Sequence, residues 1–136
     1  MRVLIVEARY HPDVAEALTD GATAALEKGG ARFDRMSVPG VLEIPAAIAI
    51  AVNAGFNGYI ALGAVTGPAH IAQIFYAETM RALTALSASG LALGQGIVLA
   101  GDEGAARDLA VSHDIGGDAA RACLSLTTIS QRLGLS

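Results

Sequence analysis

Residues 58–65 read Gly-Tyr-Ile-Ala-Leu-Gly-Ala-Val, an unbroken run of apolar and small residues. A strand of this composition is typical of a parallel sheet that helices cover on both faces. A second run of this kind, residues 2–7, begins almost at the first residue and is rich in β-branched side chains. Two helical segments with a further strand between them separate the two runs, so the chain is expected to adopt an α/β fold.

Strand and helix signals alternate along the rest of the chain. Strands are expected over residues 2–7, 32–38, 58–65 and 96–100. Helices are expected over residues 12–28, 44–53, 70–88, 103–111 and 117–133. Since no repeat or linker interrupts this order, residues 1–136 are predicted to form one flavodoxin-like domain. Its architecture would be a three-layer αβα sandwich around a four-stranded parallel sheet.

The composition predicts self-association. Charged residues make up 16% of the chain and hydrophobic residues 53%, whereas ordinary soluble domains carry roughly a quarter charged residues. A small domain with so little charge cannot cover its whole surface with polar groups. We therefore expect part of that surface to be buried against copies of the same chain.

The sequence argues against several partners, cross-links and targeting segments. The net charge of −4 argues against a nucleic-acid partner. Cys123 is the only cysteine, which excludes an intrachain disulfide. Glu7 and Arg9 interrupt the first apolar run, so no signal peptide is expected. The longest apolar stretch, residues 44–52, is too short to span a bilayer. A cytoplasmic protein with no membrane partner is expected.

Candidate binding groups follow two of the predicted strands. Glu43 comes after the turn at Pro39-Gly40, where it either stabilises a helix start or binds a polyol or amine. Residues 66–69 open the next helix, where backbone N–H groups either hold a phosphate or simply connect the elements. Because ligands bind at the carboxyl ends of parallel strands, these segments predict a small-molecule site.

Two charged or titratable side chains are candidates for chemistry. His70 either transfers protons near neutral pH or faces solvent in a first helical turn. Arg107 either clamps a phosphate or is a solvated helix residue. His11 and His113 lie in other loops, and three isolated histidines do not predict a metal site.

Three segments resemble the 6,7-dimethyl-8-ribityllumazine synthases, which catalyse the penultimate step of riboflavin biosynthesis. Residues 38–45 read Val-Pro-Gly-Val-Leu-Glu-Ile-Pro and match the family's Val-Pro-Gly-x-x-Glu-Ile-Pro, and residues 6–10 and 61–65 also match. The resemblance covers nearly the whole chain. It implies a homopentamer with active sites between neighbouring subunits. It also implies condensation of 5-amino-6-(D-ribitylamino)uracil with 3,4-dihydroxy-2-butanone 4-phosphate, without a metal or redox cofactor.

The resemblance also implies roles for individual residues. Tyr10 would stack on the pyrimidine and Glu43 would orient the ribityl amine. His70 would shuttle protons as the catalytic residue, while Arg107 and the amides after Thr66 would hold phosphate. Gln95 falls where a neighbouring subunit usually offers an aromatic residue. The substrate-binding residues implied are Tyr10, His11, Val41, Leu42, Glu43, Ala64, Val65, Thr66, Gly67, Ala69, Gln95 and Arg107.

The chain departs from the family after Gly63. The family reads Gly-x-Val-Ile-Arg-Gly-Glu-Thr-x-His, whereas this chain reads Gly-Ala-Val-Thr-Gly-Pro-Ala-His. Counting back from Glu78 along the helix puts the position of the family's catalytic histidine at Ile71. Either the neighbouring His70 takes the catalytic role, or no histidine does. The alternative function is a relative that keeps the pentameric scaffold or binds a ribityl ligand without catalysis. A generic flavodoxin-like binding domain would leave the match at residues 38–45 unexplained.

Overall fold

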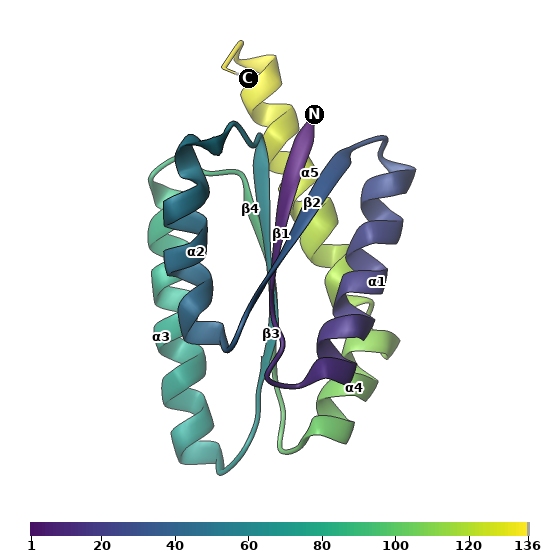
Figure 1. Ribbon diagram of the computed structural model, residues 1–136, viewed down its shortest axis with the longest axis vertical. Helices are drawn as coiled ribbons and strands as arrows, with labels where there is room; N and C mark the ends of the chain where they lie inside the picture. The colour runs from purple at the N-terminus through teal and green to yellow at the C-terminus, as the bar shows by residue number, and fades with distance from the viewer. Residues whose placement is uncertain (136) are drawn as a thin grey trace.

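A parallel sheet lies between two layers of helices in the computed structural model, which describes residues 1–135 (Figure 1). The strands are β1 (Arg2–Ala8), β2 (Arg32–Val38), β3 (Gly58–Val65) and β4 (Leu93–Leu99), in the spatial order β2-β1-β3-β4. One face is covered by α2 (Ile44–Ala51) and α3 (Ala69–Ala88), and the other by α1 (Pro12–Lys28), α4 (Glu103–Ser112) and α5 (Ile115–Arg132). This arrangement confirms the predicted three-layer α/β fold.

The positions of β1 and β3 in the middle of the sheet explain why residues 2–7 and 58–65 are apolar. Along β1, Val3 and Ile5 point into the core under α1 and α5, whereas Leu4 and Val6 point into the core under α2 and α3. The β3 strand is buried in the same way on both faces. By contrast, β2 pairs only with β1 and is mostly exposed, which is why its sequence is polar.

The fourth strand begins earlier than predicted. We expected it over residues 96–100, but it covers Leu93–Leu99 and includes Gly94 and Gly96, although glycine weakens the interior of a strand. A Cβ added at Gly94 would lie 1.9 Å from the Ala119 carbonyl oxygen of α5. Glycine is therefore required because α5 packs directly on the β4 backbone.

The last helix also begins earlier than predicted, at Ile115 instead of Gly117. Asp114 precedes it with a φ of 46°, a left-handed conformation that turns the chain between α4 and α5. Gly116 then lies so close to α1 that an added Cβ would be 1.9 Å from the Leu18 carbonyl oxygen. Gly116 is therefore part of the contact between α1 and α5.

Cys123 is a core residue, as its apolar surroundings in the sequence suggested. Burial raises the pKa of its thiol from 9.0 to about 12. Only the thiolate reacts with alkylating agents, so we expect iodoacetamide at pH 8 to modify the folded chain about 10³-fold more slowly than the urea-unfolded chain. Mass spectrometry of timed samples measures both rates. Equal rates would contradict the buried position.

Candidate functional site

A pocket of about 380 Å³ opens at the carboxyl ends of the two central strands. The chain leaves β1 toward β2 on one side, while β3 pairs with β1 on the other. Such a change of direction is the usual ligand site of an open parallel sheet. The residues that line the pocket come from the loops after β1, β2 and β3 and from α3, namely Tyr10, His11, Gly40, Val41, Leu42, Glu43, Ala64, Val65, Thr66 and Phe75.

A single turn of 3-10 helix, Val41–Glu43, forms one wall of this pocket. Its start is fixed by Glu43, whose Oε1 accepts a hydrogen bond from the Gly40 N–H at 2.9 Å. The turn packs against β3 at Gly63, where an added Cβ would lie 2.8 Å from Val41 Cγ1. The structure is thus compatible with both roles predicted for Glu43, because one carboxylate oxygen stabilises the turn and the other is left for a ligand.

Eight residues that the sequence assigned to substrate binding come together here, from three separate segments. They are Tyr10, His11, Val41, Leu42, Glu43, Ala64, Val65 and Thr66. Phe75 also lines the pocket, although the residue match gave it no role. It reaches the pocket from the second turn of α3, the helix that follows Thr66.

The structure places the other assigned residues outside this pocket. Gly67, with a φ of 118°, and Ala69 form the connection into α3, and His70 is exposed in the first turn of that helix. Gln95 is exposed on the edge strand β4, where its Oε1 accepts a hydrogen bond from the Ile97 N–H at 3.0 Å. The roles given to these residues stay predictions.

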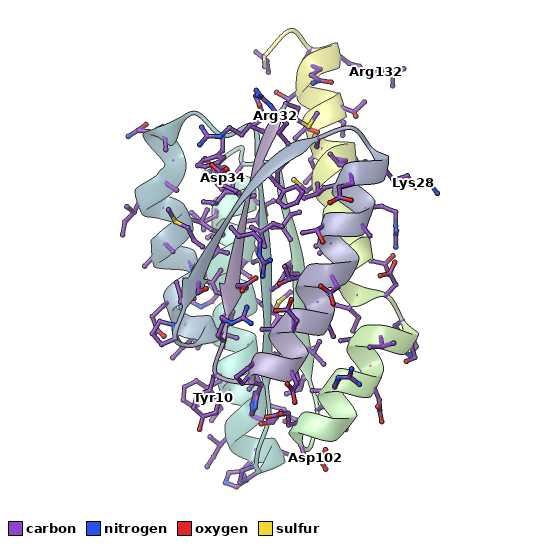
Figure 2. All side chains as sticks on the ribbon, turned by 45° about the vertical axis from the view of Figure 1, so that its right-hand side comes forward. Tyr10, Lys28, Arg32, Asp34, Asp102 and Arg132 are labelled. Atoms are coloured by element: carbon purple, nitrogen blue, oxygen red, sulfur yellow. The ribbon has the colours of Figure 1, made fainter. Side chains whose placement is uncertain are left out.

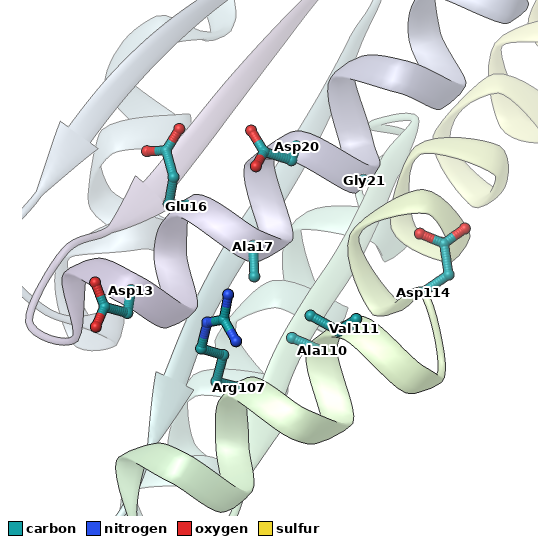
Figure 3. A pocket seen from close by; sticks show the side chains of 9 residues that line it. All are labelled: Asp13, Glu16, Ala17, Asp20, Gly21, Arg107, Ala110, Val111 and Asp114. Carbon is teal, nitrogen blue, oxygen red and sulfur yellow. The ribbon is translucent and has the colours of Figure 1, made fainter.

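Arg107 lies in a different groove, between α1 and α4. Its guanidinium points from α4 toward α1 (Figure 3). Four carboxylates, Asp13, Glu16, Asp20 and Asp114, line the same groove. Their negative charge attracts the guanidinium and repels a phosphate. Within one subunit, therefore, this groove does not provide a phosphate site, and the phosphate contact predicted for Arg107 would have to be made elsewhere.

His11 is held between two polar partners at the edge of the pocket. Its Nδ1 lies 2.9 Å from Glu103 Oε2, and its Nε2 lies 2.9 Å from Thr66 Oγ1. The Tyr10 ring packs edge-on against the imidazole, with the ring centroids 4.9 Å apart. Figure 2 shows Tyr10 and Asp102, the neighbours of His11 and Glu103 in sequence, at the same end of the sheet. A carboxylate, an imidazole and a hydroxyl thus lie in series, with the imidazole and the hydroxyl lining the pocket and the Glu103 carboxylate outside it.

Sequence reasoning did not find this arrangement. Glu103 is 92 residues from His11 and reads as an ordinary acidic residue in the first turn of a helix. His11 was assigned to the pocket only because it follows Tyr10. The only usable signal is that both residues follow predicted parallel strands, whose carboxyl ends share one edge of the sheet.

Residues 1–135 hold neither a cluster of metal-ligating side chains nor a helix suited to a membrane. No three His, Cys, Asp or Glu side chains in this part of the chain lie close enough together to hold a metal ion. In the same residues, no helix combines the length and hydropathy that crossing a membrane requires.

The sheet order and the position of the pocket define a flavodoxin-like α/β protein with a small-molecule site. A family model described as 6,7-dimethyl-8-ribityllumazine synthase matches residues 1–131. Among similar proteins, 6,7-dimethyl-8-ribityllumazine synthase 1 of Rhizobium meliloti is 46% identical, over 98% of this chain and 94% of that protein. The 6,7-dimethyl-8-ribityllumazine synthase of Sphingopyxis alaskensis is 39% identical, over 98% and 97% of the two chains.

The chain therefore belongs to the 6,7-dimethyl-8-ribityllumazine synthase family. This confirms the resemblance inferred from residues 38–45. Members of the family are transferases of riboflavin biosynthesis, and the chain is an enzyme of this class.

Proposed function

We propose that the chain condenses 5-amino-6-(D-ribitylamino)uracil with 3,4-dihydroxy-2-butanone 4-phosphate to give 6,7-dimethyl-8-ribityllumazine. The observation that carries this proposal is the pocket at the sheet's switch point, which gathers the residues that match the family's substrate-binding segments. The reaction proceeds through imine formation, loss of phosphate and ring closure. These steps require that two substrates be held together and that protons be moved between them.

The ribityl-pyrimidine substrate is proposed to be held by Tyr10 on its pyrimidine side and by Glu43 on its ribityl side. The Tyr10 side chain is 77% exposed at the pocket, so its ring is available to stack on a pyrimidine. Glu43 uses Oε1 to accept from the Gly40 N–H, which leaves Oε2 to accept from an amine or hydroxyl of the ribityl chain. Val41, Ala64 and Val65 supply the apolar walls.

The phosphate is proposed to bind where β3 leads into α3. Backbone amides of Gly67 and Ala69 lie at the N-terminal end of a 20-residue helix, a position that favours anions. His70, in the first turn of α3, is on this phosphate side and remains a candidate for proton transfer. Gln95 and Arg107 lie outside the pocket of their own subunit, so we assign them to contacts with the pocket of a neighbouring copy.

We propose that the functional unit is a homopentamer. The layer formed by α2 and α3 exposes large apolar side chains, including Ile50 at 84% and Ile74 at 63% exposure. Phe75, in the same layer, lines the pocket. A neighbouring copy on this layer would cover apolar surface and help to close the site.

Light scattering at micromolar concentration is expected to report five times the mass of one chain. Association should depend on the apolar α2–α3 layer, so Ile74→Glu should shift the protein toward smaller species because it places a charge in the contact. A persistent wild-type monomer would contradict the pentamer and the shared site.

The proposed reaction is tested by incubating the wild-type protein with both substrates and following the absorbance of the lumazine. Calorimetry with the ribityl pyrimidine alone measures binding separately. Product formation supports the enzyme. Binding without product would instead favour the alternative predicted from the sequence, a pentameric scaffold that holds a ribityl ligand.

Glu43→Gln is expected to weaken binding of the ribityl-amine substrate by about tenfold, because it removes a charge-assisted hydrogen bond. The amide oxygen still accepts from the Gly40 N–H, so the 3-10 turn should persist. The KM for the butanone phosphate should change much less. The matched control is Glu27→Gln, an exposed carboxylate near the far end of α1. Equal effects on both substrates would contradict the assignment of Glu43 to the ribityl side.

A further inference from the structure

We infer that the proton transfer of the first, imine-forming step in this pocket runs through a relay of Glu103, His11 and Thr66. The inference rests on the proposed function, because it assigns roles within the same site. It differs from the expectation drawn from the sequence, which placed the catalytic histidine at His70. The inference is based on the two hydrogen bonds that His11 makes, one to Thr66 in the pocket and one to Glu103 beside it.

The backbone at His11 is fixed by the start of α1. His11 is the residue before the first helical turn, Pro12 follows it, and the His11 carbonyl accepts from the Ala15 N–H at 3.0 Å. Side chains at this position commonly cap their own helix. The His11 side chain makes no such bond. Instead it extends to Glu103 and Thr66, so the helix start positions the imidazole for the pocket.

The two contacts determine which ring nitrogen carries the proton. An ionised Glu103 carboxylate only accepts hydrogen bonds, so Nδ1 of His11 must donate to it. In the neutral imidazole, Nε2 is then the acceptor, and the Thr66 hydroxyl donates to it. The imidazole is 13% exposed and the Glu103 side chain 45% exposed, so the ring is shielded from solvent while its carboxylate partner lies at the surface.

Thr66 connects the imidazole with the space where a ligand would bind, since it lines the pocket together with His11. When an amine nitrogen of the ligand gives up a proton to Thr66 Oγ1, the Thr66 proton passes to His11 Nε2. The resulting imidazolium is stabilised by the Glu103 carboxylate. In hydrolytic triads, too, an imidazole takes the proton of a hydroxyl and a carboxylate stabilises the imidazolium, although there the hydroxyl oxygen attacks the substrate itself.

The relay suits the first step of the proposed reaction. Attack of the substrate amine on the butanone carbonyl forms a C–N bond and turns the carbonyl oxygen into an alkoxide. The proton taken from the amine nitrogen is stored on His11 and returned through Thr66 to that oxygen. The oxygen then leaves as water, with its second proton from the nitrogen, as the C=N bond forms. Every proton removed from nitrogen is thus accounted for on the departing water.

His11→Gln is the first test. We expect it to lower kcat about 10²-fold, the usual effect of losing a general acid–base group. Thr66→Val should have a similar effect because it removes the hydroxyl and keeps the shape, and Thr66→Ser should restore most of the activity. The matched control is His113→Gln, an exposed histidine after α4 that lies outside the pocket, and this variant should retain wild-type activity.

The role of Glu103 as a positioning residue requires a readout other than activity. Nitrogen-15 NMR of the neutral His11 ring should show the proton on Nδ1 in the wild-type protein. Free imidazoles of histidine favour a proton on Nε2, so Glu103→Ala, which removes the acceptor for Nδ1–H, should shift the His11 signals toward that pattern. His113, measured in the same spectra, should be unaffected.

The outcomes separate this inference from the proposed function. If the wild-type protein forms lumazine and His11→Gln forms it at the same rate, the relay is overturned and the proposed function stands. If the wild-type protein forms no lumazine, the proposed function fails and the NMR spectra decide on the relay. A His11 ring that carries its proton on Nε2 in the wild-type protein would overturn the relay in either case.

Discussion

Replacing Gly94 by alanine is expected to destabilise the folded chain by at least about 3 kcal/mol, the upper part of the usual range for overpacked cores. The added methyl group would lie 1.9 Å from the Ala119 carbonyl oxygen and 3.0 Å from the Cys123 amide nitrogen. Both atoms belong to the backbone of α5, so no side chain can rotate away. The helix itself would have to move off β4.

Urea or thermal unfolding measures this effect. For a chain of this length, about 3 kcal/mol corresponds to a fall in Tm of roughly 10 °C. Gly101→Ala is the matched control, because an added Cβ there meets no atom within 4 Å and the backbone is not left-handed. Gly116→Ala should be as damaging as Gly94→Ala, since it clashes with the Leu18 carbonyl. A Gly94→Ala protein that melts with the wild type would contradict the packing of α5 on β4.

These glycines also show why the sequence predicted some elements better than others. The limits of β2 and β3 were predicted to the residue, at Arg32–Val38 and Gly58–Val65, because composition and turn signals agreed there. In β4 and at the start of α5, glycine lowers the local propensity of the element. The contacts that require it come from helices far away in sequence. Local reasoning therefore shortened both elements.

The candidate site, like the fold, was predictable only where local sequence signals specify it. A contiguous motif at residues 38–45, and the residues that end β1 and β3, were enough to identify one pocket. The pairing of His11 with Glu103 depends on how α4 is placed after β4, which no local pattern specifies. The same applies to Arg107, whose position opposite the carboxylates of α1 follows from the packing of two helices.

A charged residue within the central strand is a further feature that the sequence did not explain. Glu7 looked like the end of an apolar run, but it is 1% exposed within β1. Its Oε2 accepts from the buried Thr19 hydroxyl at 2.6 Å, and it forms ion pairs with Arg9 and, at 3.2 Å, with Arg35. Arg9 also bonds Glu16 at 3.0 Å, which lowers the pKa of that carboxyl, and the hydrogen bonds to Glu16 and Glu7 raise the pKa of Arg9.

Glu7→Ala is expected to cost about 3 kcal/mol of folding free energy, near the lower end of the range for removing one partner of a buried ion pair. The reason is that three groups lose their partner at once. The Thr19 hydroxyl is fully buried and cannot reach water, so its desolvation is no longer compensated. Arg9 and Arg35 are 33% and 41% exposed, and solvent recovers part of their loss. Chemical denaturation measures the difference.

Glu7→Gln separates the charge of this residue from its shape. The amide oxygen can still accept from Thr19, so the cost should be about half that of Glu7→Ala if the hydrogen bond and the ion pairs contribute equally. Thr19→Val should destabilise the wild-type chain, because it leaves a buried carboxylate oxygen without a donor, and should cost much less in the Glu7→Ala background. Additive effects of the two substitutions would contradict a direct interaction between Glu7 and Thr19. Coupled effects would mean that a hydrogen-bonded charge on β1 helps to fix α1, and hence His11 at its start, over the end of the sheet.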